Sequence, residues 1–289
     1  MNNKKHYFLT VAFSTAFSLV ALFASQKSFA WGDTGHRVVG QIAENHLSDS
    51  TRNKLAKIIG DETLAIAATW ADDVRSDPKY KFQDSFHFVT IPDGMDYNSS
   101  PKNPDGDIIV AIQSMSQVLK SKKSTPEEKV RAVRLLAHFV GDIHQPHHVG
   151  NEKDRGANWC IVKLFGSFTN LHSVWDSGII DSTKLSYTEI AKHLDRESRA
   201  PESAKKAWQK DDVLVWAKES QSLRNDLYPA PVNDAPPRSY CKTRNEDRVP
   251  NELVPSLSYD YRFKYKDLME ERMLKAGIRL AGLLNRLLD

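Results

Sequence analysis

Histidine and aspartate side chains recur in this sequence at spacings that could bring them together around a metal ion. His138 and Asp142 are four residues apart in a segment with helical periodicity, so both side chains point to one face of the helix. His172 and Asp176 repeat this spacing, and His148 lies ten residues after His138. Imidazole nitrogens and carboxylate oxygens are typical zinc ligands, and zinc lowers the pKa of a bound water to about 7. The pattern therefore indicates a metal centre.

Either His–Asp pair alone is weak support, because such a pair is more often an exposed ion pair or a satisfied core histidine. Three further positions strengthen the interpretation. His36 is five residues after Trp31, Asp72 lies in the run Thr69-Trp70-Ala71-Asp72-Asp73, and His87 lies between two phenylalanines. Together these side chains could bind more than one metal ion.

Residues 1–30 have the pattern of a secretory signal peptide. Lys4 and Lys5 precede a mostly apolar stretch, and Ser28-Phe29-Ala30 supplies the small residues of a cleavage site. A retained membrane anchor is the alternative, but the apolar run is short for a spanning helix. Cleavage after Ala30 would give Trp31 a free α-amino group beside its carbonyl oxygen, which together can chelate a metal. We expect a secreted or periplasmic protein without a membrane anchor.

The charge balance of the chain argues against a broad basic surface. The 289 residues include 40 basic and 37 acidic side chains, but three of the lysines lie in the predicted signal peptide. Without them the formal net charge is zero, which disfavours nucleic-acid binding through overall charge. Any attraction to phosphate must then be local, and a metal cluster could supply it.

Helical periodicity dominates the remaining chain. It predicts a helix with Val38, Val39 and Ile42 on its buried face, capped by Asp33 or Thr34. Further helices are predicted over Lys129–Ile143, Ser186–Leu194, Asp211–Leu227 and Lys264–Leu288. The segment Cys160–Phe168 has strand composition and a turn at Gly166, which predicts a small hairpin. We predict a mostly α, single-domain multi-helix bundle over residues 31–289.

The two cysteines, Cys160 and Cys241, are open to two interpretations. In an exported protein they would form a disulfide, and the alternative is a pair of free buried thiols. Cys241 lies in the long proline-rich loop Tyr228–Pro255. A bond to Cys160 would fasten this loop, which is longer than unfastened loops in compact domains usually are.

Five motifs occur in a fixed order along the chain. They are Trp31-Gly32-x-x-Gly35-His36, Trp70-Ala71-Asp72, His87-Phe88, His138-Phe139-Val140-Gly141-Asp142-x-x-Gln145-Pro146-x-His148 and Asn170-Leu171-His172-x-x-Trp175-Asp176. In this combination the sequence resembles the zinc-dependent single-strand-specific nucleases and 3′-nucleotidases of fungi, plants and bacteria. The resemblance covers the whole mature chain and implies a helical fold of the kind shared with zinc-dependent phospholipase C.

The resemblance implies a zinc nuclease domain over residues 31–289 that binds three zinc ions. The first zinc would be held by Asp72, His87, His138 and Asp142. The second would be held by His148, His172 and Asp176. The third would be held by the α-amino nitrogen and carbonyl oxygen of Trp31 and by His36, with Asp142 bridging the first and third ions.

The resemblance also implies the reaction. A hydroxide that bridges the first and third zinc ions would attack phosphorus, and the second zinc would stabilise the leaving 3′-oxygen. The substrates would be single-stranded DNA and RNA, and 3′-nucleotides, and the products would carry 5′-phosphates. The catalytic residues would be Asp72, Asp142 and Arg75, of which Arg75 would contact phosphate; without the family it would be interpreted as a surface arginine.

Three residues would bind the substrate by the same resemblance. Phe88 would stack on an unpaired base, although alone it would be interpreted as a core phenylalanine. Thr90 stands where fungal members carry an aspartate that bonds the base, and Asn158 follows Ala157, which replaces a family glycine. His144 and His147 match no ligand position, and we interpret them as exposed rather than as donors that support the ligands.

Two other functions fit parts of the sequence. A zinc-dependent phospholipase C shares the architecture, but its last ligand is characteristically a glutamate where this chain has Asp176, and its tryptophan-to-histidine spacing is longer. A zinc-scavenging protein without enzymatic activity would be expected to have closed metal coordination. The sequence favours the nuclease, and we expect a monomer.

Overall fold

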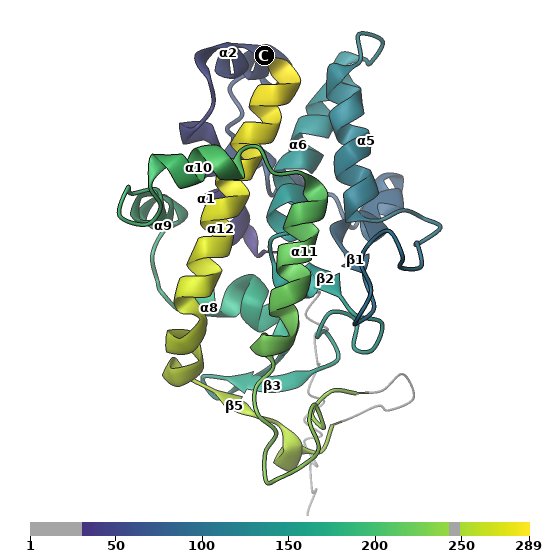
Figure 1. Ribbon diagram of the computed structural model, residues 1–289, viewed down its shortest axis with the longest axis vertical. Coiled ribbons are helices and arrows are strands. Elements are labelled where there is room, and N and C mark those ends of the chain that lie inside the picture. The colour runs from purple at the N-terminus through teal and green to yellow at the C-terminus, as the bar shows by residue number, and fades with distance from the viewer. Residues whose placement is uncertain (1–30, 243–248) are drawn as a thin grey trace, which may run out of the picture.

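The computed structural model describes residues 31–242 and 249–289, so the predicted signal peptide lies outside the described residues. The described chain is mostly helical, as the sequence predicts (Figure 1). Its α-helices are α1 (Asp33–Asn45), α2 (Asp49–Ile59), α3 (Leu64–Ala67), α4 (Trp70–Asp73), α5 (Ile108–Lys120), α6 (Pro126–Asp142), α7 (Leu171–Ser173), α8 (Ile179–Asp181), α9 (Tyr187–Leu194), α10 (Glu202–Trp208), α11 (Val213–Leu223) and α12 (Tyr259–Leu288). The short 3₁₀-helices are η1 (Pro78–His87), η2 (Pro146–His148), η4 (Arg224–Leu227) and η5 (Asn251–Leu253), and η3 (Val174–Gly178) is a π-helix.

The long helix α12 forms the centre of the bundle. In Figure 1 it runs along the long axis of the molecule, with α1 behind it, α5 and α6 on one side and α9 and α10 on the other. The helices α1 and α12 approach closely, because a Cβ atom at Gly277 would lie 2.6 Å from the Cβ of Ile42. Apolar side chains of both helices, such as Val39 and Leu280, are fully buried there. The burial of this apolar surface is what holds the bundle together.

The predicted helices are present, and α6 shows why. Thr125 and Glu128 form a capping box at its start, Pro126 occupies the first turn, and Val133, Leu136 and Val140 are buried on one stripe. The predicted side-chain cap of α1 is wrong. Gly32 precedes this helix and makes no side-chain cap, and the Thr34 hydroxyl instead donates to Asp181 Oδ1 at 2.9 Å.

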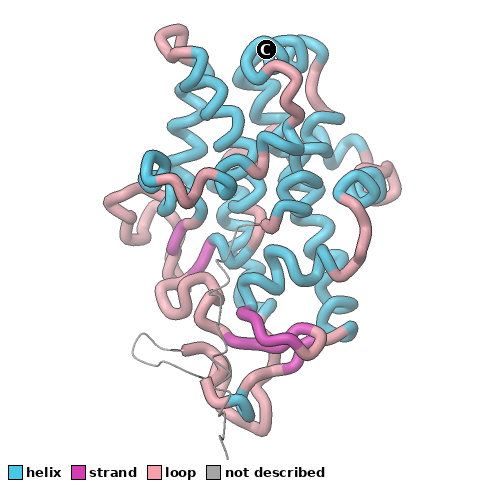
Figure 2. Tube along the Cα trace, turned by 180° about the vertical axis from the view of Figure 1, so that it is seen from behind, coloured by secondary structure: helices cyan, strands magenta, loops and turns pink. Residues whose placement is uncertain are grey.

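Two small sheets complete the fold, and Figure 2 shows their strands below most of the helices. The strands β3 (Ile161–Leu164) and β4 (Ser167–Asn170) form the predicted antiparallel hairpin around Gly166, and β5 (Ser256–Leu257) pairs in parallel with β3. A second, parallel pair joins β1 (Val89–Thr90) to β2 (Val149–Gly150). The sequence did not predict this pair, because two-residue strands are too short to show an alternating pattern.

Cys160 and Cys241 form a disulfide, which decides between the two interpretations left open by the sequence. Backbone hydrogen bonds flank it, from Ile161 N to Tyr240 O and from Lys242 N to Trp159 O, each 2.9 Å long. The proline-rich loop is therefore fastened beside the hairpin. Across the described ranges 31–242 and 249–289, no helix combines the length and apolar character that crossing a membrane requires.

Candidate metal centre

Four side chains converge on Asp142, and together with it they form a set from four separate elements that we call the Asp142 group. Its members are His36 of α1, Asp72 of α4, His87 of η1, and His138 and Asp142 of α6. Asp142 Oδ1 lies 3.2 Å from His36 Nε2, and Asp142 Oδ2 lies 3.2 Å from both His87 Nδ1 and His138 Nε2. Asp72 Oδ1 is 3.9 Å from these same atoms of His87 and His138. The four-residue spacing on α6 thus brings both side chains to one point, as predicted.

A second set of ligand-type side chains, the Asp176 group, lies nearby. It consists of His148 of η2, His172 of α7 and Asp176 of η3. The two carboxylate oxygens of Asp176 lie 3.6 Å from His148 Nε2 and 3.1 Å from His172 Nε2. Asp176 sits in a π-helical turn, a distortion that is frequent at functional sites. All three side chains are buried.

Backbone carbonyl groups orient three of the histidine rings. The Nδ1 atoms of His138, His148 and His172 lie 2.7, 2.6 and 2.6 Å from the carbonyl oxygens of Ala68, His87 and Gly156. A carbonyl oxygen only accepts, so each Nδ1 carries a proton, and it is Nε2 of each ring that faces the carboxylates and is placed to bind a metal. Metal-ligating histidines are held in this way, with the second ring nitrogen fixed by an outer acceptor.

Several facing atoms lack hydrogen bonds, although they are buried. His36 Nε2, Asp142 Oδ1, Asp72 Oδ1 and His148 Nε2 have no hydrogen-bond partner among the described residues. Buried polar atoms are normally paired, so a concentration of unpaired nitrogen and oxygen atoms at one point calls for an explanation. Nitrogen and carboxylate donors in this arrangement fit divalent metal ions such as zinc.

The pKa values of these groups follow from burial and mutual charge. Burial lowers the pKa of His36 and of His87 to about 4, so both are neutral at pH 7, the form that binds metal. Burial raises the pKa of Asp72 to about 6. Burial lowers the pKa of His138, but the charges of Asp142 and Asp72 outweigh it and raise that pKa to about 9. Without a metal, a proton on His138 therefore supplies the positive charge that the two carboxylates attract.

Trp31 lies beside the Asp142 group, as the ordered motifs predict. Its side chain is fully buried, and a Cβ atom at Gly141 would lie 2.9 Å from His36 Nδ1 and 3.6 Å from Trp31 Cδ1. Glycine at position 141 is thus required for His36 to approach α6. Gly32 N donates to Asp176 O at 2.8 Å, which joins the start of the described chain to the Asp176 group.

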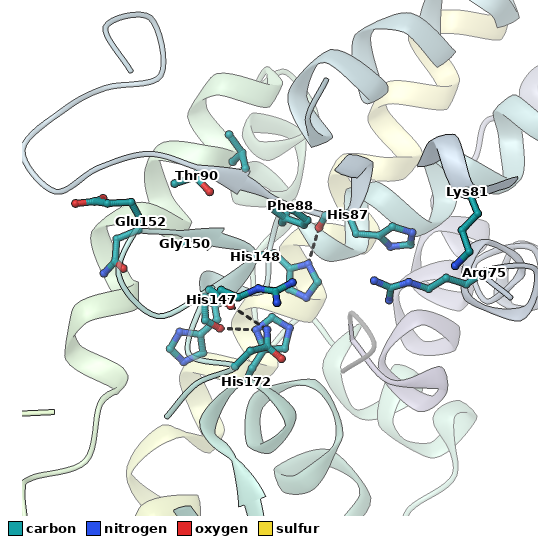
Figure 3. Close-up of a pocket in the computed structure, with 15 residues that line it drawn as sticks. Arg75, Lys81, His87, Phe88, Thr90, His147, His148, Gly150, Glu152 and His172 are labelled. Atoms are coloured by element: carbon teal, nitrogen blue, oxygen red, sulfur yellow. Dashed lines mark hydrogen bonds between the residues drawn. The ribbon is translucent and has the colours of Figure 1, made fainter. Parts of the chain in front are cut away.

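The histidines open onto a cavity of about 440 Å³, shown in Figure 3. Its lining includes His87, His148 and His172 in the centre, and Arg75 and Lys81 point into it from one side. Thr90 and Glu152 lie on the opposite side of His87. The site is therefore a buried group of metal-type ligands at the floor of an open cavity.

Comparison with known proteins agrees with this geometry. The family model described as S1/P1 Nuclease matches residues 31–289. The chain belongs to the S1/P1 nuclease family. It is 30% identical to Endonuclease 4 of Arabidopsis thaliana over 275 residues, which cover 90% of each chain. It is also 30% identical to Nuclease S1 of Aspergillus oryzae over 283 residues, which cover 93% of this chain and 95% of that protein.

Among solved structures, the S1/P1 nuclease fold described here is similar to the alpha-toxin of Clostridium perfringens at a TM-score of 0.40 and 15% identity. The match covers 90% of this chain and 63% of the toxin chain. The family assignment comes from the sequence comparisons, and it makes the chain a nuclease whose family acts on single strands.

The residues expected to bind substrate all line the cavity of this S1/P1 nuclease. Phe88 is 42% exposed, although its neighbours His87 and Val89 are buried. Thr90 is exposed and is paired in register with Gly150 across β1 and β2. Asn158 Nδ2 donates to Arg155 O at 2.9 Å. Arg75 Nη1 lies 3.7 Å from Asp72 Oδ1, at the border between the cavity and the Asp142 group.

The expectation that His144 and His147 are exposed is wrong, because both are buried. His144 Nδ1 donates to Val140 O at 2.7 Å, and its Nε2 lies 3.0 Å from Arg279 Nη1. His147 lines the cavity next to the Asp176 group, and its ring packs against Trp175 and Tyr228. Apart from Val140, these partners lie far away in the sequence, so local spacing could not have shown the burial.

Two supporting features were missed. Gln145 donates from Nε2 to Asp176 Oδ1 at 2.5 Å and accepts from His147 N at 2.6 Å, so it orients a candidate ligand. Arg155, Gly156 and Ala157 all have positive φ, between 55° and 63°. The methyl group of Ala157 thus occupies a backbone conformation that favours glycine, which explains why glycine is expected at this position.

Proposed function

We propose that this chain is a zinc-dependent phosphodiesterase that hydrolyses single-stranded DNA and RNA to products with 5′-phosphates, and that it also dephosphorylates 3′-nucleotides. The observation that carries the proposal is the set of buried ring nitrogens and carboxylate oxygens, several of them unpaired, beside a cavity with an exposed phenylalanine. Membership of the S1/P1 nuclease family supports it.

The two residue groups would hold three zinc ions in the proposed assignment. Asp72, His87, His138 and Asp142 would hold the first ion, and His148, His172 and Asp176 the second. Trp31 would hold the third through its backbone nitrogen and oxygen, together with His36 and a shared Asp142. When bound, zinc supplies Lewis-acid polarisation of phosphoryl oxygens and activates water near neutral pH.

The protein's own part in the reaction is to orient the phosphate and stabilise its charge. The Arg75 guanidinium lies within 4 Å of Asp72, so it can donate hydrogen bonds to a phosphate oxygen held at the Asp142 group. Asp72 and Asp142 would contribute by holding the positive charge of the metal ions next to the phosphate. Because these carboxylates are buried, their interactions are stronger than they would be in water.

Selection of single strands would come from Phe88. An exposed aromatic ring at the cavity wall can stack on a base only when that base is not paired, and such stacking contributes about 1–3 kcal/mol per base. Thr90 and Asn158 flank the same cavity and offer hydroxyl and amide groups to the nucleotide. A threonine at position 90 can both donate and accept, so it imposes a weaker choice of base than a carboxylate would.

Export would precede activity in this proposal. Removal of residues 1–30 gives Trp31 a free amino group, which binds metal where an acylated nitrogen does not. The disulfide fits a secreted or periplasmic protein. We further propose that the mature chain, residues 31–289, is a single zinc nuclease domain that acts as a monomer.

The test is a mass spectrum of the products formed from a single-stranded oligonucleotide by the mature protein, with and without a zinc chelator. Chelator-sensitive release of fragments with 5′-phosphates and 3′-hydroxyls is expected. An intact oligonucleotide, with bound zinc confirmed by elemental analysis, would refute the proposal, and phosphatidylcholine would then be the next substrate to try.

A further inference from the structure

A row of side chains leads from the candidate metal centre to the outer edge of the cavity. Lys81, Asp84 and His87 are spaced by three residues on η1, which is a 3₁₀-helix. Residues three apart eclipse one another in a 3₁₀-helix, so these side chains share one face. His87 belongs to the Asp142 group, and Lys81 lies two turns before it. The local helix type therefore aligns a cation with the metal-type ligands.

Ion pairs connect this row to Arg75. Asp84 Oδ2 lies 3.5 Å from Lys81 Nζ, and Asp84 Oδ1 lies 3.8 Å from Arg75 Nε. Arg75 in turn lies 3.7 Å from Asp72. Asp84 thus holds two cations at neighbouring positions, and the three side chains together carry one net positive charge.

The two cations are accessible from the cavity. The side chain of Lys81 is 55% exposed and that of Arg75 is 29% exposed, and both line the cavity. Figure 3 shows both pointing inward from the side of His87 opposite to Thr90. Exposed ion pairs contribute only about 0–1 kcal/mol, so Lys81 can exchange Asp84 for a phosphate at little cost.

We propose that Lys81 binds the phosphate that follows the scissile one on its 3′ side. The inference rests on the proposed function, in which products with 5′-phosphates require a 3′-oxygen to leave, and it adds that the nucleotide bearing this 3′-oxygen is the one that stacks on Phe88. The strand beyond the scissile phosphate then continues away from Phe88 and Thr90, towards Arg75 and Lys81. Arg75, which is next to Asp72, contacts the scissile phosphate, and Lys81 contacts the next one.

This subsite distinguishes substrates by their number of phosphates. A 3′-nucleotide and a dinucleotide with one phosphodiester have no phosphate for Lys81, whereas a trinucleotide cleaved at its first bond has one. Lys81 therefore favours chains over mononucleotides. Affinity for a single strand falls as salt rises, and each phosphate contact makes the slope of log affinity against log salt concentration steeper by about 0.7.

The test compares kcat/KM for 3′-thymidylate, the thymidine dinucleotide and the trinucleotide, with mass spectrometry reporting first-bond cleavage. The variants are Lys81→Met and Lys81→Arg, made in the mature zinc-loaded protein. The control is Lys79→Met, an exposed lysine of the same helix whose Nζ lies 5.3 Å from the Tyr80 ring centroid.

We expect Lys81→Met to lower kcat/KM for the trinucleotide about tenfold more than for 3′-thymidylate, as for one lost hydrogen bond to a charged group. For the trinucleotide, the slope of log kcat/KM against log salt concentration should become less steep by about 0.7. Lys81→Arg should retain the wild-type preference for the trinucleotide and its salt dependence, and Lys79→Met should change neither quantity. Equal losses on all three substrates would overturn the subsite alone, whereas a zinc-loaded wild type inactive on every substrate would overturn the proposed function and the subsite with it.

Discussion

Residues 138–148 contribute to two buried polar regions that differ in how their polar atoms are paired. Around Asp142, some of the facing ring nitrogens and carboxylate oxygens, namely His36 Nε2, Asp72 Oδ1 and Asp142 Oδ1, have no hydrogen-bond partner among the described residues. Around His144, all three nitrogens of Arg272 donate hydrogen bonds, to His144 O, Glu219 Oε2 and Ser220 Oγ. Arg279 adds hydrogen bonds to Glu219 and to Asp211, and we call this set the Arg272 network.

The difference shows that burial of ionisable groups does not by itself identify a functional site. Both regions contain buried histidines, and both bring ionisable groups together from distant parts of the chain, with Glu219 and Asp211 of the second region only partly buried. In the Arg272 network opposite charges satisfy one another, which stabilises the packing of α11 and α12. In the Asp142 group, the pairing is incomplete in the way that a cation-binding site requires.

The largest effect is expected from Asp142→Asn, which removes a carboxylate shared by most of the Asp142 group. Activity should fall by about 10³-fold or more, because a catalytic metal contributes several kcal/mol and each 1.36 kcal/mol is tenfold. Zinc content should fall with it, while the circular dichroism spectrum stays that of a helical protein. Full activity at unchanged zinc content would show that the site has been wrongly placed.

Arg272→Met should lower the stability of the fold and leave zinc binding unchanged, which is the opposite of the result expected for Asp142→Asn. It leaves Glu219 half-buried with one cation fewer, and breaking a buried ion pair costs about 3–5 kcal/mol. Urea denaturation should show that loss, while the zinc content of the folded fraction is unchanged. Lys266→Met, which removes a partly exposed ion pair with Glu270 on the same helix, is the control and should change stability by no more than about 1 kcal/mol. An Arg272→Met protein that is as stable as wild type but lacks zinc would contradict the conclusion that the Arg272 network stabilises the fold and the Asp142 group binds the metal.

Gln145→Leu tests the hydrogen bond that orients Asp176 within the Asp176 group. Loss of the hydrogen bond to Asp176 Oδ1 should weaken zinc binding about 10–100-fold, as for other outer groups that orient ligands. Competition with a chelator of known affinity measures this change. Unaltered zinc affinity would mean that Asp176 is oriented by other groups.

The smallest effect is expected in the pH dependence of the Arg272 network. Burial raises the pKa of Glu219, but Arg279 and Arg272 outweigh it and bring that pKa to about 2. A lowered pKa stabilises the fold above the unfolded value of about 4.3, and this contribution disappears as the pH falls to about 2. The stability difference between wild type and Glu219→Gln, measured by urea denaturation, should therefore shrink across this window. A constant difference would show that the Glu219 charge does not stabilise the fold.

The sequence predicted one His–Asp pair in each group from its four-residue spacing, and the remaining members only through the resemblance that the ordered motifs carry. His144 shows the limit of such reasoning: the arginines that pair with it lie on α12, more than 125 residues away. The row from Lys81 to His87 was missed for a different reason. The three-residue spacing of these side chains is meaningful only once the segment is known to be a 3₁₀-helix, and its composition does not predict one.

The disulfide links the oxidation state of two cysteines to the orientation of a candidate ligand, His172. Cys160 O accepts from Leu171 N at 2.8 Å, directly before His172, and Cys160 N donates to Ala157 O in the loop whose Gly156 carbonyl holds the His172 ring. The bond to Cys241, 81 residues away, therefore fastens both backbone segments that orient this histidine. If the Asp176 group binds metal, reduction of the disulfide should loosen the His172 ring, and the metal content of a preparation would then depend on the oxidation state of Cys160 and Cys241.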